Sequence, residues 1–520
     1  IHYREHEKGG FMAIEKNAMN VVSKFKLGSE QVPVECNIAT EEQISKLLSY
    51  CVYPMVISEE VLVGEVNVTG KLAVKLTYMT QENQIVCRDS ICDFSSKFLA
   101  STIDPSQKIN VCAKLIDASA VVLSENNVKI SSIVELVYTG IKHDELSYLS
   151  SADESFCTKL SEVKVTTLAA SESQEFEEEI KVPIKDKFER LISTDADVIV
   201  KDITAGSNFV SVSGEIITKT MFLSDSETGK IVTLSTSESF KRELEVTGVS
   251  QTSMVEVKAI PRKDLLKVET LQEENSTSLN YVVTIKAKVL AYDETNINCA
   301  EDIYSLTNNI EIVTESFKKL SLGGLDYFES KIEGSLTLNE TQPRVDKIIA
   351  TSSPYIISTN SYIKDGEIFL EGVAYTNVIY LNDEEMTTNS IQIEVPFTIS
   401  EKTSGLENSE ISASEVLDDV DVIVKKGREL YFDAKVKANV CYYNNENDAV
   451  ITDVAVGEEL PERDCAIEIY FGKEGDTLWD IAKSLNISLD SLREQNSMVP
   501  EVLEGNTNLT IYYQKNKRAE

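Results

Sequence analysis

Apolar and polar residues alternate along most of the chain, and this alternation predicts half-buried β-strands. Between Val66 and Tyr78 the apolar side chains stand at every second position around a central glycine, and lysines, threonines and an asparagine separate them. A period of two residues turns one face of a strand toward a core and the other toward solvent. Such strands are typical of antiparallel sheets that cover a core on one side. We therefore predict a mainly β fold.

This strand has three diverged copies, and each copy carries a glycine in its middle. An aromatic residue follows each glycine by eight positions. The glycines are Gly70, Gly214 and Gly372, and the aromatic residues are Tyr78, Phe222 and Tyr380. A glycine weakens the interior of a strand, so we interpret these residues as anchors of a structural repeat that mark either a β-bulge or a close backbone approach. The sequence leaves both alternatives open.

A second shared strand closes each copy with a tyrosine, which defines a repeat of about 150 residues. The closing residues Tyr138, Tyr292 and Tyr442 follow their glycines by 68, 78 and 70 positions. We predict three tandem, diverged, sandwich-like antiparallel β domains, and these span residues 12–150, 160–300 and 315–452. The pair Asp365-Gly366 predicts a hairpin turn within the third domain.

Local patterns predict two further features of the repeats. A short segment before each glycine strand has the spacing of one or two helical turns. These segments are 43–48, 188–192 and 343–349. Polar residues also gather between the domains, where we expect linkers. The expected linkers lie near 145–160, 300–320 and 452–464.

The C-terminal residues 464–516 follow a different pattern, which predicts a small β-α-α-β module. Four apolar residues have the spacing of an amphipathic helix, and Thr477 precedes them as a helix cap. They are Leu478, Ile481, Ala482 and Leu485. A second helix capped by Ser488 and a strand at 509–513 complete the order. The run from Ile469 to Ala482, which contains Gly475-Asp476-Thr477, is similar to the opening of a LysM module.

LysM modules hold N-acetylglucosamine chains in a shallow groove between two loops, and the resemblance implies such a groove here. The candidate binding residues are Gly475, Asp476 and Thr477 in the first loop and Met498, Val499, Pro500 and Val502 in the second. The second loop lacks the common Asn-Pro opening, and its apolar residues suit a protein partner. Glycan and protein ligands both stay open. We interpret Trp479 as a packing residue, with sugar stacking as the alternative.

Charge restricts the classes of partner. The chain has 86 acidic and 50 basic residues and a net charge of −36. Such a field repels phosphate backbones and anionic lipid surfaces, so we expect no nucleic-acid binding. No run approaches the ~20 apolar residues that a membrane span requires, so we expect no membrane insertion. The acidic surface is either a solvated exterior or a complement to a basic partner.

Cysteine usage and the N-terminal residues indicate a cytoplasmic protein. The nine cysteines include no C-x-x-C pair, which is typical of unpaired thiols in a reducing compartment. Residues 8–11, just before Met12, have the sequence that a translated ribosome-binding site would give. We expect residues 1–11 to be a disordered leader, with a genuine extension as the alternative. No apolar signal segment follows Met12.

The sequence offers no catalytic, cofactor or metal site. His143 is the one histidine outside residues 1–11, and it lies in a polar segment. Motifs for a phosphate-binding loop, a nucleophile elbow or a zinc protease do not occur. Cys87 and Cys92 have no neighbouring histidine or second cysteine pair to complete a metal site. We predict a non-enzymatic protein without a cofactor.

The three Val-x-Val-x-Gly strands with their closing aromatic strands, followed by the LysM-like module, resemble the SPOCS-domain family of clostridial spore-coat morphogenesis proteins in Firmicutes. Repeat 3 also keeps Gln342-Pro343-Arg344-Val345, close to the family's proline-containing approach, whereas repeats 1 and 2 depart from it. The resemblance implies a sporulation scaffold that helps anchor the spore-coat basement layer around the forespore, in the mother-cell cytoplasm. It implies stage-IV sporulation protein A, the ATPase of that layer, as the partner. The alternative is a peptidoglycan-binding protein that acts through the module.

Overall fold

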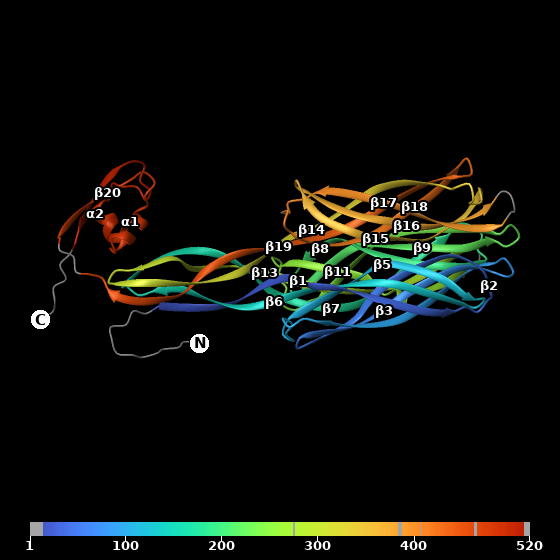
Figure 1. The fold of residues 1–520 in the computed structure, drawn as a ribbon, viewed down its shortest axis with the longest axis horizontal. Coiled ribbons are helices and arrows are strands. Elements are labelled where there is room, and N and C mark those ends of the chain that lie inside the picture. Colours follow the sequence, from blue (N-terminus) through green and yellow to red (C-terminus); the bar gives the residue numbers. More distant parts are fainter. Residues whose placement is uncertain (1–13, 274–275, 383–386, 406, 462–464, 514–520) are drawn as a thin grey trace.

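The computed structural model describes residues 14–273, 276–382, 387–405, 407–461 and 465–513. Antiparallel sheets make up most of these residues, and two short helices lie near the C-terminal end. The predicted mainly β fold with a small C-terminal β-α-α-β module is confirmed. Figure 1 shows a broad body of strands, a narrow stalk that leaves it, and the C-terminal module beside the far end of the stalk. The predicted leader at 1–11 lies outside the described residues.

Each repeat folds into two sheets with one shared strand order. The first, last and fifth strands form a long sheet, and the second, third and fourth strands form a short sheet. In repeat 1 the long sheet contains β1 (Ile14–Ala39), β6 (Asn127–Ala152) and β5 (Lys108–Ser124), and the short sheet contains β2 (Ile44–Leu62), β3 (Glu65–Thr80) and β4 (Ile85–Leu99).

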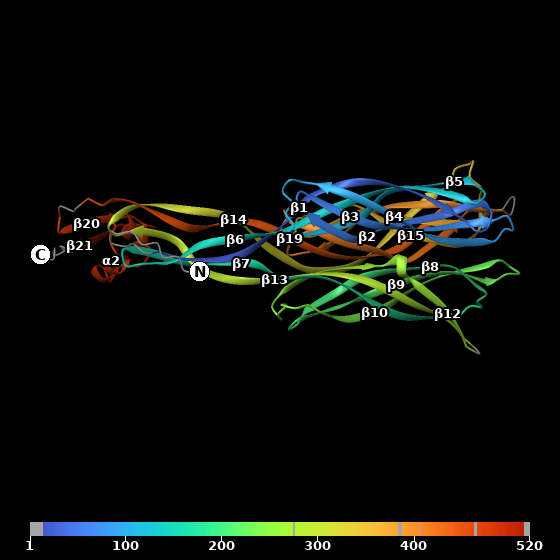
Figure 2. The same cartoon turned by 90° about the horizontal axis from the view of Figure 1, so that it is seen from below.

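Repeats 2 and 3 follow the same order, and Figure 2 shows the repeats side by side in the body. In repeat 2 the long sheet contains β7 (Phe156–Ile184), β13 (Ser276–Ser305), β11 (Met254–Pro261) and β12 (Lys267–Glu273), and the short sheet contains β8 (Arg190–Ala205), β9 (Phe209–Asp225) and β10 (Lys230–Glu245). In repeat 3 the long sheet contains β14 (Asn308–Thr337), β19 (Glu429–Glu459) and β18 (Glu410–Lys425), and the short sheet contains β15 (Val345–Lys364), β16 (Glu367–Asn382) and β17 (Thr388–Lys402).

The expected helical turns before the glycine strands are wrong. Strands β2, β8 and β15 occupy most of these segments and pair with the glycine strands along their length. A short apolar run has the same appearance in a helix and in a strand, and here the backbone of the neighbouring strand supplies the hydrogen bonds. The predicted turn at Asp365-Gly366 is present, and both residues have positive φ values of 52° and 78°.

Each repeat glycine lies beneath a phenylalanine of the next strand. The facing pairs are Gly70–Phe94, Gly214–Phe240 and Gly372–Phe397. A Cβ atom added to Gly70 would lie 2.1 Å from the Phe94 ring. The strand on the other side of each glycine carries a β-bulge directly after the facing residue. A phenylalanine ring therefore approaches each glycine closely, and the β-bulge lies in the paired strand rather than at the glycine itself.

The core of each sandwich fills the space between its long and short sheets. In repeat 1, Leu72 of β3 and Leu136 of β6 are fully buried in one apolar cluster, and repeats 2 and 3 have equivalent clusters. Burial of each such side chain stabilises the fold by about 1.5–3 kcal/mol. The aromatic anchors Tyr78, Phe222 and Tyr380 are buried in these three clusters.

The stalk consists of paired extensions of the long sheets. The first and last strands of each long sheet continue beyond the sandwich, and a β-bulge beside the closing tyrosine marks the point of departure. Apolar side chains from the three ribbons pack against each other in the stalk. The cluster includes Val21, Leu146, Val165, Ile297, Phe317 and Val450. The three repeats therefore share a second core outside their sandwiches.

The expected linkers are wrong for this reason. Residues 145–160 and 300–320 belong mainly to the strands of the stalk, and β19 continues to Glu459 through much of the third expected linker. Their polar residues alternate with Leu146, Tyr148 and other buried side chains, which face the neighbouring ribbons. His143 is exposed and pairs with Val22 within β6, so it lies on a strand rather than in a linker.

Repeat 2 differs from the others by an insertion in its long sheet. The 3-10 turn η1 (Lys263–Leu265) separates β11 from β12, whereas β5 and β18 are continuous. This insertion contributes to the longer spacing of 78 residues between Gly214 and Tyr292, and the rest comes mainly from β13, which begins further before its tyrosine than β6 does. The carboxylate of Asp264 in the turn lies 3.0 Å from the ammonium of Lys71 in repeat 1. The insertion therefore joins two repeats.

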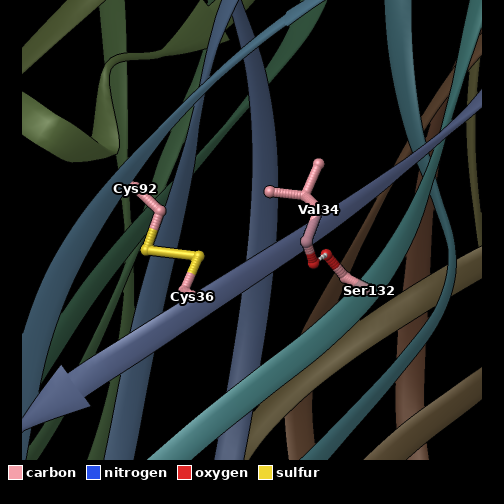
Figure 3. Close-up of a disulfide and its surroundings, with 4 residues drawn as sticks. All are labelled: Val34, Cys36, Cys92 and Ser132. Atoms are coloured by element: carbon pink, nitrogen blue, oxygen red, sulfur yellow. Dashed lines mark hydrogen bonds between the residues drawn. A yellow bond between two sulfur atoms is a disulfide. The ribbon is translucent and has the colours of Figure 1, made fainter.

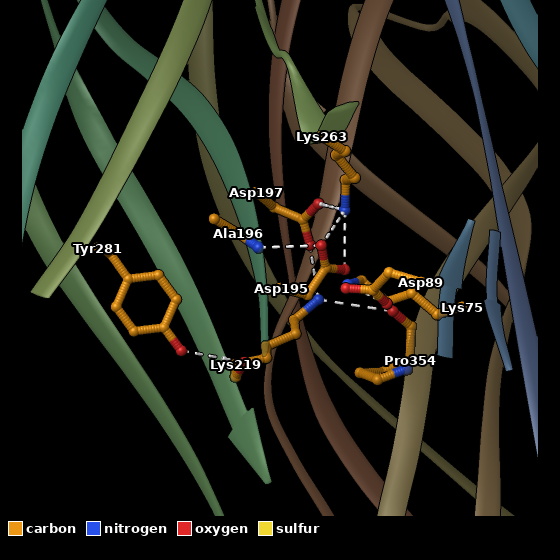
Figure 4. Close-up of polar contacts among 9 residues, drawn as sticks. All are labelled: Lys75, Asp89, Asp195, Ala196, Asp197, Lys219, Lys263, Tyr281 and Pro354. Carbon is orange, nitrogen blue, oxygen red and sulfur yellow. Dashed lines mark hydrogen bonds and ion pairs between the residues drawn. The ribbon is translucent and has the colours of Figure 1, made fainter. Parts of the chain in front are cut away.

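Lys263 of this turn reaches a largely buried ion cluster in repeat 2 (Figure 4). Its Nζ lies 2.8 Å from Asp195 and 2.7 Å from Asp197, and Asp197 is also 2.6 Å from Nζ of Lys219. The Lys263 ammonium stands 4.5 Å from the ring centre of Tyr53 in repeat 1. Burial acts to lower the pKa of Lys263, but the two carboxylates hold this pKa well above its ordinary value. Lys263 is therefore charged in the folded chain.

Acid should weaken the body through this cluster. Burial opposes the charged form of Asp197, yet Lys219 and Lys263 lower its pKa below the ordinary value. A carboxylate with a lowered folded pKa stabilises the fold above its unfolded pKa of about 3.9, and this contribution is lost as the pH falls through the folded pKa. We expect the free energy of unfolding to drop below about pH 4 and to drop less steeply in Asp197→Asn. Urea unfolding across this range provides the measurement, and parallel curves for the two proteins would contradict the assignment.

A disulfide links the two sheets of repeat 1 (Figure 3). It joins Cys36 of β1 to Cys92 of β4, and their Cα atoms are 6.2 Å apart. Beside it, the Ser132 hydroxyl donates a hydrogen bond to the carbonyl oxygen of Val34 at 3.2 Å. The prediction of unpaired thiols is wrong for this pair, because the sandwich brings together two cysteines that are 56 positions apart.

Removing this disulfide should lower the stability of repeat 1. We expect a reductant to reduce the free energy of unfolding by about 2–4 kcal/mol, because the unfolded chain regains the entropy of an open loop. The Cys36→Ser variant should show the lower stability with and without reductant, and Cys465→Ser, at an exposed position, should keep the response of the parent chain. A parent chain whose free energy of unfolding does not change with reductant would contradict the prediction.

Candidate functional site

The C-terminal module has its own small core and two capped helices. It contains β20 (Ile467–Gly472), α1 (Leu478–Ser484), α2 (Leu489–Gln495) and β21 (Thr507–Tyr512). The hydroxyl of Thr477 accepts a hydrogen bond from the backbone of Asp480, and Ser488 caps α2 in the same way. Apolar residues from all four elements form one cluster. This confirms the predicted element order and both predicted helix caps.

The structure brings the two predicted loops into contact. The amide of Gly475 donates to the carbonyl of Leu503 at 2.8 Å, and the amide of Leu503 donates to the carbonyl of Asp476 at 2.9 Å. Thr477 forms an isolated β-bridge with Val502. Gly475 has a φ of +90°, which favours glycine at this turn. The two loops therefore form one backbone-bonded surface, which we call the groove.

The candidate side chains of the second loop differ in exposure. Met498 is 96% exposed and Val502 is 51% exposed, whereas Val499 packs against the core of the module. Pro500 is also exposed. In the first loop, the Asp476 carboxylate accepts a hydrogen bond from the backbone of Lys473 at 2.9 Å. Met498, Pro500 and Val502 are thus accessible to a ligand, and Val499 supports the loop from below.

An ion pair holds the second loop against helix α2. Nε of Arg493 lies 2.7 Å from the Glu501 carboxylate, and the carbonyl of Glu501 accepts a hydrogen bond from the backbone of Leu478 at 2.9 Å. The hydrogen bond from Arg493 is the main cause that lowers the pKa of Glu501. The loop is therefore tied to both helices, and its exposed apolar side chains are presented on a fixed backbone.

An exposed apolar row on β20 is a candidate surface that we did not predict. Ile467, Ile469 and Phe471 point away from the helices and are more than half exposed, with Phe471 at 71%. Tyr512 of β21 lies opposite Ile467 and is also exposed. The alternation Ile-x-Ile-x-Phe was visible in the sequence. It has the same appearance as a buried strand face, because sequence alone does not show on which side of a two-stranded sheet the helices pack.

Trp479 does not lie in the groove. Its indole nitrogen donates to the Asp302 carboxylate at 2.8 Å, and its ring meets the Tyr304 ring edge-on at 5.1 Å. Both partners belong to the end of β13 in the stalk. The interpretation of Trp479 as a packing residue therefore holds, but the packing partner is the stalk.

The described residues offer few alternatives for chemistry. Among them, no group of three histidine, cysteine, aspartate or glutamate side chains is arranged to hold a metal ion. None of the helices in the described ranges has the length and apolar character to cross a membrane. The groove presents backbone groups, the Asp476 carboxylate and the exposed apolar side chains of the second loop.

The fold and the groove define a β-sandwich repeat protein that carries a small binding module. The family model of the LysM domain matches residues 473–511, which contain both groove loops. This match indicates binding of peptidoglycan or a related carbohydrate as the activity common to such modules. No curated protein and no solved structure is found to match the chain.

Proposed function

We propose that this chain is a non-catalytic scaffold that holds a cell-envelope structure in place through its LysM module. The observation that carries the proposal is the position of the groove. Its loops belong to a module at the far end of a stalk, and the exposed Met498 and Val502 lie on one of these loops. The three sandwiches pack into one body by way of the stalk core and of ion pairs between repeats, such as Lys71–Asp264 and Lys437–Glu215. A rigid body with a terminal binding module suits a structural tether.

The finer proposal is that the chain helps anchor the spore-coat basement layer, with stage-IV sporulation protein A as its partner. Its support is the resemblance of the three repeats and the module, in this order, to the SPOCS-domain family. Further support comes from the apolar character of the groove and of the exposed row on β20, because buried apolar side chains form the centre of protein interfaces. This proposal places the chain in the mother-cell cytoplasm at the forespore surface.

The second candidate is direct binding of peptidoglycan. The match to the LysM domain favours it, and the Gly475-Asp476-Thr477 loop is intact. Co-sedimentation of the full chain with insoluble peptidoglycan, beside a pull-down with the ATPase, separates the two candidates. Retention by the ATPase alone supports the protein partner, and retention by peptidoglycan alone supports the glycan.

Trimming the second loop should weaken binding to a protein partner. We expect Met498→Ala and Val502→Ala each to weaken binding of the ATPase by about 1–2 kcal/mol, because both side chains would be buried at the centre of the contact. Val63→Ala changes an exposed apolar residue in the β2–β3 turn, far from the groove, and should leave affinity unchanged. Titration calorimetry with the full chain gives the affinities, and thermal unfolding shows whether the module is intact. Unchanged affinity in both loop variants would exclude the groove as the docking site.

The cellular location provides an independent test of the scaffold proposal. A fluorescent fusion should form a shell around the forespore in a sporulating cell. A diffuse signal throughout the mother cell would contradict the proposal.

A further inference from the structure

The module touches the stalk through one side of helix α1. Nζ of Lys483 lies 2.6 Å and 2.8 Å from the two carboxylate oxygens of Asp302, and the indole of Trp479 donates to the same carboxylate. Hydrogen bonds between an ammonium and a carboxylate are stronger than neutral ones. One stalk carboxylate therefore holds two side chains that lie one helical turn apart.

A second group of contacts lies beside the first. The Tyr304 hydroxyl donates to the carbonyl of Ile487 at 2.8 Å, and the side-chain amide of Asn486 donates to the carbonyl of Ser305 at 2.9 Å. Tyr304 is 3% exposed and belongs to the apolar cluster of the module rather than to that of the stalk. The stalk thus contributes a side chain to the core of the module.

The local backbone of the stalk prepares these contacts. The register of β13 against β7 shifts between Ala300 and Asp302, which is a β-bulge. A bulge redirects the side chains that follow it. Burial acts to raise the pKa of Asp302, but the hydrogen bonds from Lys483 and Trp479 lower this pKa from its ordinary value. Asp302 therefore carries a negative charge at its contact with Lys483 and Trp479.

We propose that the end of the stalk is a docking site for the chain's own LysM module, and that Asp302 is the positioning residue that fixes the orientation of the groove. Helix α1 begins directly after Thr477 of the first groove loop, so an anchor at Trp479 also orients that loop. The module therefore keeps one fixed orientation relative to the stalk. This inference is independent of the ligand that the groove binds.

A consequence is that the Trp479 side of the module is covered. A ligand that reaches the docked module meets the groove loops and the exposed row on β20. A ligand that required Trp479 would first have to separate the module from the stalk and break the contacts of Asp302 and Tyr304.

The single tryptophan of the chain makes the proposal testable by fluorescence. In the full chain, Asp302→Ala should shift Trp479 emission to longer wavelength and raise its acrylamide quenching constant about twofold, because the indole exchanges its partners for water. The anisotropy decay should also change from the tumbling of the whole chain to the faster motion of a free module. Lys483→Met removes the same ion pair from the side of the module and should give a smaller change in the same direction.

The matched control is Glu301→Ala. Glu301 is the neighbour of Asp302 and pairs with Lys159 at the surface, 2.7 Å away, so its removal should leave Trp479 emission unchanged. The main thermal transition of all variants should match that of the parent chain, which shows that the body is folded. A parent chain whose Trp479 is quenched like a free indole, or an Asp302→Ala variant that matches the parent, would overturn the proposal.

Discussion

Replacement of Lys263 by methionine is expected to lower the free energy of unfolding by about 3 kcal/mol, because it removes the ammonium from two largely buried carboxylates. Methionine has a similar length, so little packing volume is lost. Asp195 would lose the ammonium 2.8 Å away, and Asp197 would keep only Lys219. The loss should appear as a lower midpoint of unfolding in urea.

The control for this variant is a lysine whose ion pair with a carboxylate is exposed to solvent. Lys187 pairs with Glu189 at 2.6 Å on the surface, and Lys187→Met should leave the unfolding midpoint unchanged. The triple variant Lys263→Met, Asp195→Asn, Asp197→Asn removes the unpaired charges and should recover part of the loss. A Lys263→Met protein as stable as its parent would show that the cluster is open to water.

Gly214→Ala is expected to destabilise repeat 2 by about 3 kcal/mol, at the upper end of the usual cost of overpacking. The added methyl group would lie 2.1 Å from the carbonyl oxygen of Ile199 and 2.9 Å from the Phe240 ring. The ring can rotate, but the carbonyl belongs to the backbone of the paired strand β8. Relief therefore requires the strand to move, and the measurement is the unfolding midpoint of the full chain.

Alanine variants at two further glycines provide comparisons for this prediction. Gly70→Ala would meet the Phe94 ring at 2.1 Å, and its cost should be smaller because a side chain can yield. Gly324 lies in the bulge at the base of the stalk with no atom within 4 Å of an added Cβ, so Gly324→Ala should be neutral or slightly stabilising. Equal effects at Gly214 and Gly324 would refute the close-approach interpretation.

The module was predictable because its signals are local. The helix caps at Thr477 and Ser488 and the apolar spacing of α1 act within a few residues, so the sequence specifies them directly. The two loops meet in the structure, and their role in binding stays a prediction. Met498, Pro500 and Val502 are exposed, whereas Val499 packs against the core of the module, which the local sequence does not specify.

The repeats were predictable to the level of their strands. The period of two residues and the three glycines identified the central strand of each short sheet. The expected helical turns and linkers failed for one shared reason. Short segments have no decisive period of their own, and a paired strand completes their hydrogen bonds in both cases. That strand is the next one of a hairpin for the expected helical turns and a distant one for the expected linkers.

The sequence by itself determined the β fold, the threefold repetition and the identity of the C-terminal module, because alternation, spacing and capping are local properties. Only the tertiary structure decided that the apolar sides of three polar-looking segments pack together as a stalk. It alone paired Cys36 with Cys92, gathered Lys263 with Asp195 and Asp197, and set Trp479 against Asp302. Each of these contacts joins residues far apart in sequence, and their partners are fixed by how the sheets stack rather than by any local pattern.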